Sequence, residues 1–147
     1  MCADCDFAAL KDRRILAVDD CVQITSLLRD VFATCGAKIS VVNSGEAAIL
    51  HVCVTHFDLV LLDIRMPGID GWDVLRYMRT TKPYLLARTI LITGDRYSRA
   101  AVGDSDLPRM CIVYKPFELD YLRTVACRVL ARPMDTQDIR TSRSLPA

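Results

Sequence analysis

The chain has 147 residues, of which 52% are hydrophobic, a size and composition typical of one domain around a single core. Nineteen basic and eighteen acidic residues leave a formal net charge of +1, which excludes a chain-wide attraction to nucleic acid or to an anionic membrane. No apolar run is long enough to cross a bilayer, and the first residues lack the pattern of a signal peptide. We therefore expect a cytoplasmic protein with no nucleic acid and no membrane among its partners.

Seven cysteines are spread over the whole sequence. This number is odd, and several cysteines stand at helix positions where a small apolar residue is sufficient, so free thiols are favoured over a disulfide framework. Cys2 and Cys5 have the spacing of a metal or redox pair, but no second pair accompanies them. We interpret residues 1–12 as an N-terminal tail.

The first predicted unit is a strand followed by a helix. Residues 15–18 form a short apolar run, typical of a strand buried on both faces of a parallel sheet, and the run ends at Asp19-Asp20. The next residues place apolar side chains on one helical face, and Gly36 is a typical stop. That face consists of Ile24, Leu27, Leu28, Val31, Phe32 and Cys35.

The second unit repeats this order. Residues 39–42 predict a strand, and Asn43 and Ser44 follow it as candidate helix caps. Residues 46–54 then predict a helix. The side chains expected to face inward are Ala47, Leu50 and Cys53.

A carboxylate ends the third strand, which is predicted over residues 59–62 and is followed by Asp63. Pro67 and Gly68 are typical of a turn after the strand. Asp70 can cap a helix that runs to about residue 80 and ends before Pro83. Its predicted sheet-facing side chains are Val74, Leu75 and Met78.

The last two strands are predicted over residues 89–92 and 111–114, and they end at Thr93-Gly94 and at Lys115-Pro116. Between them we expect only a short helix over 96–102, because glycine and proline follow soon after. The final helix has one apolar face, formed by Leu122, Val125, Ala126, Val129 and Leu130. We interpret residues 13–131 as one domain and 132–147 as a disordered tail or linker.

Five strands that alternate with helices predict an α/β fold with helices on both faces of a parallel sheet. The flavodoxin-like strand order 2-1-3-4-5 is the natural arrangement of five such units. In open sheets of this kind, ligands bind beyond the carboxyl ends of the strands at the point where the order reverses. Here that point lies between the first and third strands, which end in carboxylates.

The carboxyl ends of the strands bring five polar residues to one rim: Asp19, Asp20, Asp63, Thr93 and Lys115. Close carboxylates repel one another unless a cation lies among them, and oxygen ligands select a hard ion such as Mg²⁺. With an ammonium and a hydroxyl group, such a set is suited to a phosphoryl group, and one carboxylate can accept it. Each residue alone could be a helix cap or a surface charge, but their convergence on one rim favours a site. No glycine-rich nucleotide-binding loop follows any strand.

The order and spacing of four motifs resemble the receiver domain of two-component response regulators. These motifs are Asp19-Asp20, the segment from Leu61 through Asp63 and Pro67 to Gly71, Thr93-Gly94, and Lys115-Pro116-Phe117. The resemblance covers about residues 13–130. It implies that a sensor histidine kinase or a histidine phosphotransfer protein is a partner, beside an unknown downstream protein.

The resemblance also implies a role for each residue of the rim. Asp63 would be the phosphoacceptor, and Mg²⁺ would be held by Asp20, Asp63 and the backbone carbonyl of Arg65, with Asp19 assisting through water. Lys115 would pair with one phosphoryl oxygen. The Lys115-Pro116 bond corresponds to one that is usually cis in this family. Thr93 would donate to another oxygen after phosphorylation.

Three features depart from the family pattern, one of which is the short helix expected over 96–102. An aromatic residue often stands three positions before the lysine, but here Ile112 stands there, and Tyr114 is expected on the other face of that strand. We therefore expect a smaller change on the output face after phosphorylation. Arg65 and Asp95 stand two residues after Asp63 and Thr93, where they either pair across the site and hinder the attacking water or remain solvated surface charges.

The favoured function is that of a stand-alone receiver that regulates a partner by protein–protein interaction, with no enzymatic activity beyond self-phosphorylation and autodephosphorylation. One alternative is a relay or phosphate-sink receiver that passes the phosphoryl group to a phosphotransfer histidine. A second alternative is a Mg²⁺-dependent phosphohydrolase with an aspartyl nucleophile. It is disfavoured because Arg65 stands two residues after Asp63, where that chemistry usually places an acid.

Overall fold

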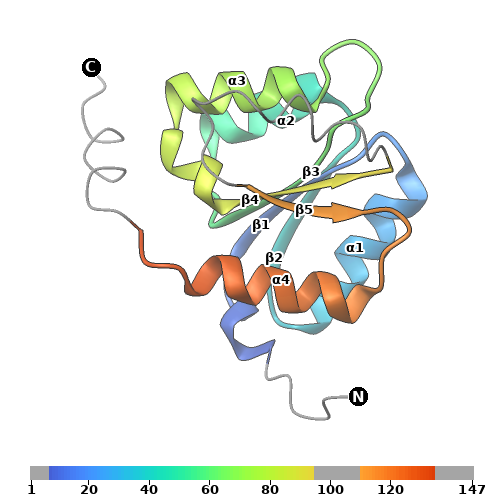
Figure 1. Cartoon of the computed structure of the whole chain (residues 1–147), viewed down its shortest axis with the longest axis vertical. Coiled ribbons are helices and arrows are strands. Elements are labelled where there is room, and N and C mark those ends of the chain that lie inside the picture. The colour runs from blue at the N-terminus through green and yellow to red at the C-terminus, as the bar shows by residue number, and fades with distance from the viewer. Residues whose placement is uncertain (1–6, 95–109, 135–147) are drawn as a thin grey trace.

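A five-stranded parallel sheet forms the centre of the computed structural model, which describes residues 7–94 and 110–134 (Figure 1). The strand order is β2-β1-β3-β4-β5, as the flavodoxin-like prediction requires. The strands are β1 (Arg14–Val18), β2 (Lys38–Val42), β3 (Leu59–Asp63), β4 (Thr89–Thr93) and β5 (Cys111–Tyr114). Each predicted strand is confirmed to within one residue at either end, because short apolar runs in this chain are bounded by charged, turn-forming or capping residues.

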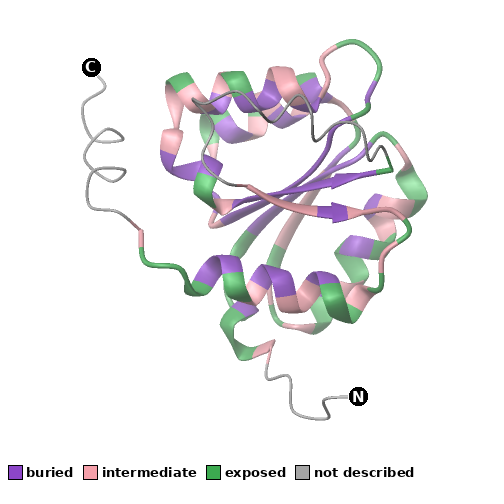
Figure 2. Ribbon diagram, in the orientation of Figure 1, coloured by how far each residue is buried: buried purple, intermediate pink, exposed green. Residues whose placement is uncertain are grey.

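Burial increases from the edges of the sheet to its centre (Figure 2). Every residue of β3 and β4 is buried, whereas β2 and β5 at the two edges are only partly buried. A strand buried on both faces carries no alternation of polar and apolar residues, which explains the continuous apolar sequence of β3. The acid at the end of β3 is therefore held in a rigid, densely packed element.

Helices cover both faces of this sheet, as predicted (Figure 1). α2 (Gly45–Val54) and α3 (Gly71–Thr81) pack with a short 3-10 helix, η2 (Pro83–Arg88), against one face. α1 (Val22–Thr34), α4 (Leu119–Ala131) and the 3-10 helix η1 (Phe7–Leu10) pack against the other. The short helix expected over 96–102 lies outside the described residues. Within the described ranges, no helix has the length and apolar character needed to cross a bilayer.

The boundaries of α3 follow from its caps. The Asp70 side chain accepts a hydrogen bond from the backbone of Asp73, and the Asp73 side chain accepts one from the backbone of Asp70, which forms a capping box. The helix ends at Thr81, before Pro83. The predicted inward residues Val74, Leu75 and Met78 are all buried, and so are the predicted inward residues of α4. η2, which was not predicted, directly follows this break.

The predicted inward face of α2 is wrong at two of its three residues: Ala47 is partly buried against the core, as predicted, but Leu50 and Cys53 are not. The structure buries Gly45, Ala48 and Val52, whereas Leu50 is 67% exposed and Cys53 is exposed. This helix is apolar around most of its circumference, so periodicity alone cannot show which side faces the sheet. In α1, Leu27 also departs from its expected position and is 46% exposed, while Leu28 and Phe32 are buried as predicted.

The chain ends predicted as tails contain residues that belong to the domain. Leu10 is fully buried, and the guanidinium of Arg123 lies over the ring of Phe7 at 4.6 Å. The predicted tail over 1–12 is therefore wrong from Phe7 onward, because η1 completes the packing of α4 and the sheet. Near the other end, Met134 packs against the core cluster of α2 and α3.

The start of α2 lies directly against the turn that follows β3, and we expect Gly45→Ala to destabilise the fold. A Cβ atom at Gly45 would stand 2.1 Å from the backbone oxygen of Ile69, which cannot move without shifting the turn. Overpacking of this kind costs about 1–3 kcal/mol in the free energy of unfolding, measurable by urea denaturation. Gly94→Ala is the control, since nothing lies within 4 Å of its added Cβ. Equal stability of the two variants would contradict this account.

Candidate functional site

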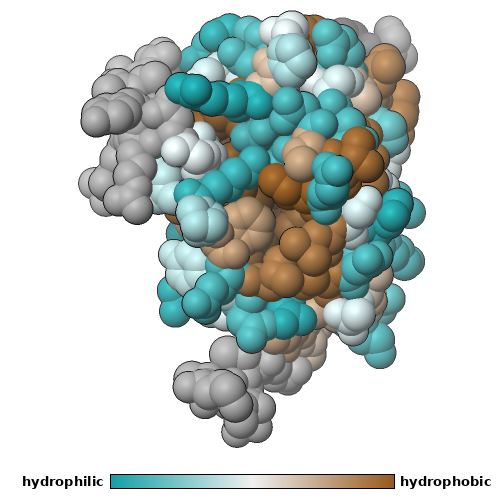
Figure 3. Space-filling model, turned by 90° about the vertical axis from the view of Figure 1, so that its right-hand side faces the viewer, coloured by the Kyte–Doolittle hydropathy of each residue, from teal (hydrophilic) through white to brown (hydrophobic). Residues whose placement is uncertain are grey.

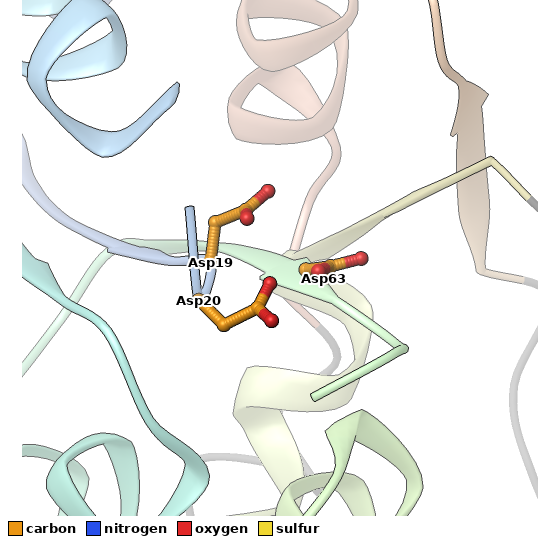
Figure 4. Close-up of side chains that lie close together, drawn as sticks. All are labelled: Asp19, Asp20 and Asp63. Carbon is orange, nitrogen blue, oxygen red and sulfur yellow. The ribbon is translucent and has the colours of Figure 1, made fainter. Parts of the chain in front are cut away.

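Three carboxylates gather where β1 and β3 end. Asp19 and Asp20 follow β1, and Asp63 is the last residue of β3, its immediate neighbour in the sheet. One oxygen of each carboxylate lies within 4.8 Å of the others. Figure 4 shows the three side chains directed to the same side of the strands. The structure thus brings together the acids that the strand-end argument selected.

These acids differ in exposure. Asp19 and Asp63 are 2% and 4% exposed, while Asp20 lies at the surface. The Asp19 carboxylate accepts a hydrogen bond from the backbone N–H of Cys21 at 2.9 Å, which fixes its direction at the start of α1. The site therefore contains two buried carboxylates and one that is exposed to solvent.

Asn43 supports this acidic turn, a role that the sequence analysis missed. Its side-chain amide donates to the backbone oxygen of Asp19 at 2.9 Å and to the buried hydroxyl of Thr25 at 3.0 Å. The cap of α2 is Ser44, which accepts from the backbone of Ala47. Asn43 follows β2, the neighbour of β1. It therefore lies at the same carboxyl edge of the sheet as the acids, and its position after a strand was a signal for a role in the site.

Lys115 follows the edge strand β5, and its side chain reaches the buried acids of the central strands. Its ammonium donates to Asp19 at 2.7 Å and stands 3.7 Å from an oxygen of Asp63. Its backbone N–H donates to the carbonyl of Thr93 at 2.8 Å, which anchors the end of β5 to the end of β4. The peptide bond between Lys115 and Pro116 is cis, as the family resemblance implies.

Thr93 and Arg65 lie on the same rim. Thr93 is the last residue of β4 and is 1% exposed. Arg65 is exposed, and its backbone N–H bonds to the Asp63 carboxylate. Its carbonyl as a metal ligand stays a prediction. Asp95 lies outside the described residues, so pairing with Arg65 also stays a prediction.

The surroundings of Asp63 and Lys115 change the pKa of both side chains. Burial and then the negative charge of Asp19 raise the pKa of Asp63 to about 6, although Lys115 and the backbone of Arg65 act in the opposite direction. Burial lowers the pKa of Lys115, but its hydrogen bond to Asp19 and the charges of Asp63 and Asp20 outweigh this effect and raise it overall. Lys115 is therefore charged, whereas burial and the neighbouring acid make the negative charge of Asp63 unfavourable.

The donor set fits a hard divalent cation. One ammonium does not cancel three carboxylates, so negative charge remains in excess. Oxygen ligands with one exposed side suit Mg²⁺, which keeps several of its own waters.

The turn after Asp63 also folds back tightly, since a Cβ at Gly71 would stand 2.5 Å from the Asp63 carbonyl. This close turn holds the acid in place.

Comparison with known proteins agrees with this site. Residues 15–126 match the family model of the response regulator receiver domain, and the chain belongs to this family. It is 35% identical to the regulatory protein AtoC of Escherichia coli (strain K12) over 129 residues. These residues cover 86% of this chain and 27% of that protein. The chain thus spans about a quarter of that relative's length.

Two further relatives span little more than the domain itself. Sporulation initiation phosphotransferase F of Bacillus subtilis (strain 168) is 30% identical over 121 residues, which cover 82% of this chain and 96% of that protein. The response regulator TrrA of Thermotoga maritima, solved in complex with Mg²⁺ and BeF, is 32% identical with a TM-score of 0.70, over 80% of this chain and 98% of that one. The receiver fold and the two-component class follow from these matches.

In metal-free buffer we expect Asp63→Asn to raise the free energy of unfolding at neutral pH. A folded-state pKa above the unfolded value means that ionisation of Asp63 destabilises the fold as pH rises through about 6. A shift of about two pKa units sets an upper limit of about 3 kcal/mol, so a gain on the order of 1–2 kcal/mol is expected. Urea denaturation with EDTA measures it.

The same pair of proteins provides the control. Well below the unfolded pKa of 3.8, the carboxyl is protonated in both the folded and the unfolded chain, and the two proteins should then differ little. Saturating Mg²⁺ should stabilise the wild type more than the variant. A variant that is less stable than the wild type at neutral pH without metal would contradict the charge excess.

Proposed function

We propose that this chain accepts a phosphoryl group on Asp63 in a Mg²⁺-dependent reaction and regulates a partner protein through the modified state. The donor would be a sensor histidine kinase or a histidine phosphotransfer protein. One observation carries the proposal: a buried, ionisable carboxylate stands between two other acids and an ammonium 3.7 Å away. Membership of the receiver family supports this assignment.

The chemistry follows from the state of each side chain. With a pKa of about 6, Asp63 is mostly ionised at neutral pH, and a carboxylate oxygen can attack phosphorus. The new P–O bond forms as the bond from phosphorus to the donor's imidazole nitrogen breaks, and the leaving nitrogen keeps the electron pair. Bound Mg²⁺, held by Asp19, Asp20, Asp63 and the Arg65 carbonyl, would neutralise charge on the phosphoryl oxygens.

Lys115 and Thr93 then stabilise the product. The Lys115 ammonium already lies between Asp19 and Asp63, so a small movement transfers its hydrogen bond from Asp19 to a phosphoryl oxygen. The Thr93 hydroxyl at the end of β4 would donate to another oxygen. Positioning and charge neutralisation are therefore the contributions of this chain to phosphoryl transfer.

A protein donor needs a surface beside the site, and the structure offers one. Figure 3 views the molecule from the side toward which β4 and β5 point in Figure 1, and an apolar area lies there among hydrophilic residues. Val22, three residues after Asp19 and at the start of α1, is 59% exposed. Exposed apolar groups next to a charged site are typical of protein interaction surfaces.

A relay role is the second candidate. It would pass the phosphoryl group from Asp63 onward to a phosphotransfer histidine. The similarity to sporulation initiation phosphotransferase F, which spans nearly the whole of that protein, favours this candidate. Transfer of label from the phosphorylated chain to a histidine phosphotransfer domain distinguishes a relay from a terminal receiver.

We expect wild-type chain treated with Mg²⁺ and acetyl phosphate to gain the mass of one phosphoryl group, and Asp63→Ala to gain none. Asp63 supplies the attacking oxygen, so its removal abolishes the adduct rather than slowing its formation. Intact-mass spectrometry measures the gain. Asp30→Ala, which removes an exposed acid on α1, should label as the wild type does.

Other outcomes assign other functions. An adduct that survives in Asp63→Ala would place the acceptor elsewhere. Continuous release of phosphate from a phosphomonoester would indicate the phosphohydrolase, whereas a single slowly lost group fits a receiver without further enzymatic activity. EDTA should prevent labelling, because three carboxylates would then face the donor's phosphoryl oxygens without a cation.

The output face is the part of the domain where this chain departs from its family. Ile112 is partly buried against the cluster of α2 and α3. Tyr114 lies two residues further along β5, so both side chains belong to one face of the strand, and the expectation that Tyr114 faces the other way is wrong. Tyr114 is thus the aromatic residue of β5 that shares a face with Ile112.

We expect Mg²⁺ and beryllofluoride to shift the amide resonances of Thr93 and Lys115 strongly and those of Ile112 and Val113 little. A compact isoleucine packed in the core has no large ring to move inward when the hydroxyl of Thr93 turns. Amide NMR spectra of the wild type and Ile112→Tyr provide the comparison. Large shifts at Ile112 in the wild type would show that Tyr114 transmits the change instead.

A further inference from the structure

A second cluster of charged residues surrounds a cavity of about 120 Å³ at the opposite end of the sheet. Its lining residues precede strands rather than follow them: Arg13 stands before β1, Asp58 before β3 and Arg88 before β4. Tyr84, Leu130 and Met134 complete much of its wall. The phosphoryl site uses none of these residues.

Arg88 joins this cavity to the end of the last helix. Its guanidinium donates to the carbonyl of Val129 at 2.6 Å, to that of Arg132 at 2.8 Å and to the sulfur of Met134 at 3.2 Å. In Figure 1, η2 and the end of α4 lie on the same side of the molecule. The three contacts fix this guanidinium in one orientation at the cavity wall.

Positive charge is in excess around the cavity. Two guanidinium groups, of Arg13 and Arg88, and one carboxylate, of Asp58, line the cavity. Arg13 also donates to the carbonyl of Ala9 at 3.3 Å, and Arg132, outside the cavity lining, donates to the sulfur of Cys111 at 3.3 Å. Burial is the main cause that lowers the pKa of Arg88, and Arg13 and Arg132 lower it further while Asp58 only partly compensates. A bound anion would offset both the burial and the like charges.

The carboxylate of Asp58, which would repel an anion, already has partners in the cavity wall. One oxygen of Asp58 accepts from the backbone N–H of Arg14 at 2.8 Å, and the other stands 3.6 Å from His56. The hydroxyl of Tyr84 and a ring nitrogen of His56 are hydrogen-bonded at 3.0 Å, and their rings stack 5.6 Å apart. The acid is thus tied into the wall, while the excess charge of the arginines remains.

We propose that this cavity binds a small oxyanion, a phosphate group carried by inorganic phosphate or by a small phosphate monoester, between Arg13 and Arg88. Planar guanidinium groups match the geometry of such oxygens, and the apolar side chains of Leu130 and Met134 leave room for a short organic body. The bound anion joins the segment before β1 to the end of α4. This site is independent of phosphorylation at Asp63.

The test is a titration of the full chain with inorganic phosphate, in EDTA and at constant ionic strength, followed by NMR of the Arg88 side chain and of the amides of His56 and Tyr84. The Asp63→Asn protein is titrated in parallel, so that binding at the carboxylate site cannot account for the shifts. We expect saturable shifts in both proteins, and about tenfold weaker binding in Arg13→Gln, because one charged hydrogen bond is lost. Glycerol 3-phosphate in place of phosphate distinguishes the two sources: tighter binding assigns a monoester, and equal or weaker binding assigns the free ion.

Arg29→Gln is the matched control, since it removes the same charge from an exposed position on α1. It should bind phosphate as the wild type does. Because Arg13 is exposed, its substitution should leave the fold intact, and an unchanged amide spectrum checks this. Shifts that increase linearly without saturation, or equal weakening in Arg29→Gln and Arg13→Gln, would overturn the proposal.

Discussion

The pairing of Lys115 with two buried carboxylates is the interaction on which the rest of the site depends. Asp19 and Asp63 are almost completely removed from water, and like charges at that depth are strongly unfavourable unless a cation compensates. Lys115 supplies one positive charge from the end of β5, and an excess of negative charge remains for a metal ion. The parallel sheet makes this possible, because it delivers residues distant in the sequence to one edge.

The supports of this arrangement come from backbone geometry as much as from side chains. The turn after β3 passes so close to the Asp63 carbonyl that only glycine fits at position 71, and Gly45 has the same relation to Ile69. Asn43 holds the acidic turn from the end of β2. Within the described residues, the acidic site is therefore supported from the ends of β1, β2 and β3.

Much of this could be predicted from the sequence, for identifiable reasons. The strands are short apolar runs with sharp ends, and their order follows from the alternation with helices, so Asp19, Asp63, Thr93 and Lys115 could be assigned to one rim. The inward face of α2 could not be predicted, because Leu50 and Val52 are equally apolar and only tertiary packing chooses between them. The supporting role of Asn43 was overlooked because a polar residue before a helix is usually its cap. Arg88 lacks any local signal, since its partners lie 41 and 44 residues away in the chain.

The outward side of α2 has a consequence for how the protein behaves at high concentration. Leu50 and Val54, one helical turn apart, are 67% and 80% exposed. With a net charge of only +1 and a pI of about 7.6, neighbouring molecules have little electrostatic repulsion to keep them apart near neutral pH. Solubility is therefore governed by this apolar stripe and by the distance of the buffer from the pI, and polar residues at Leu50 and Val54 would improve it without contact with the phosphoryl site.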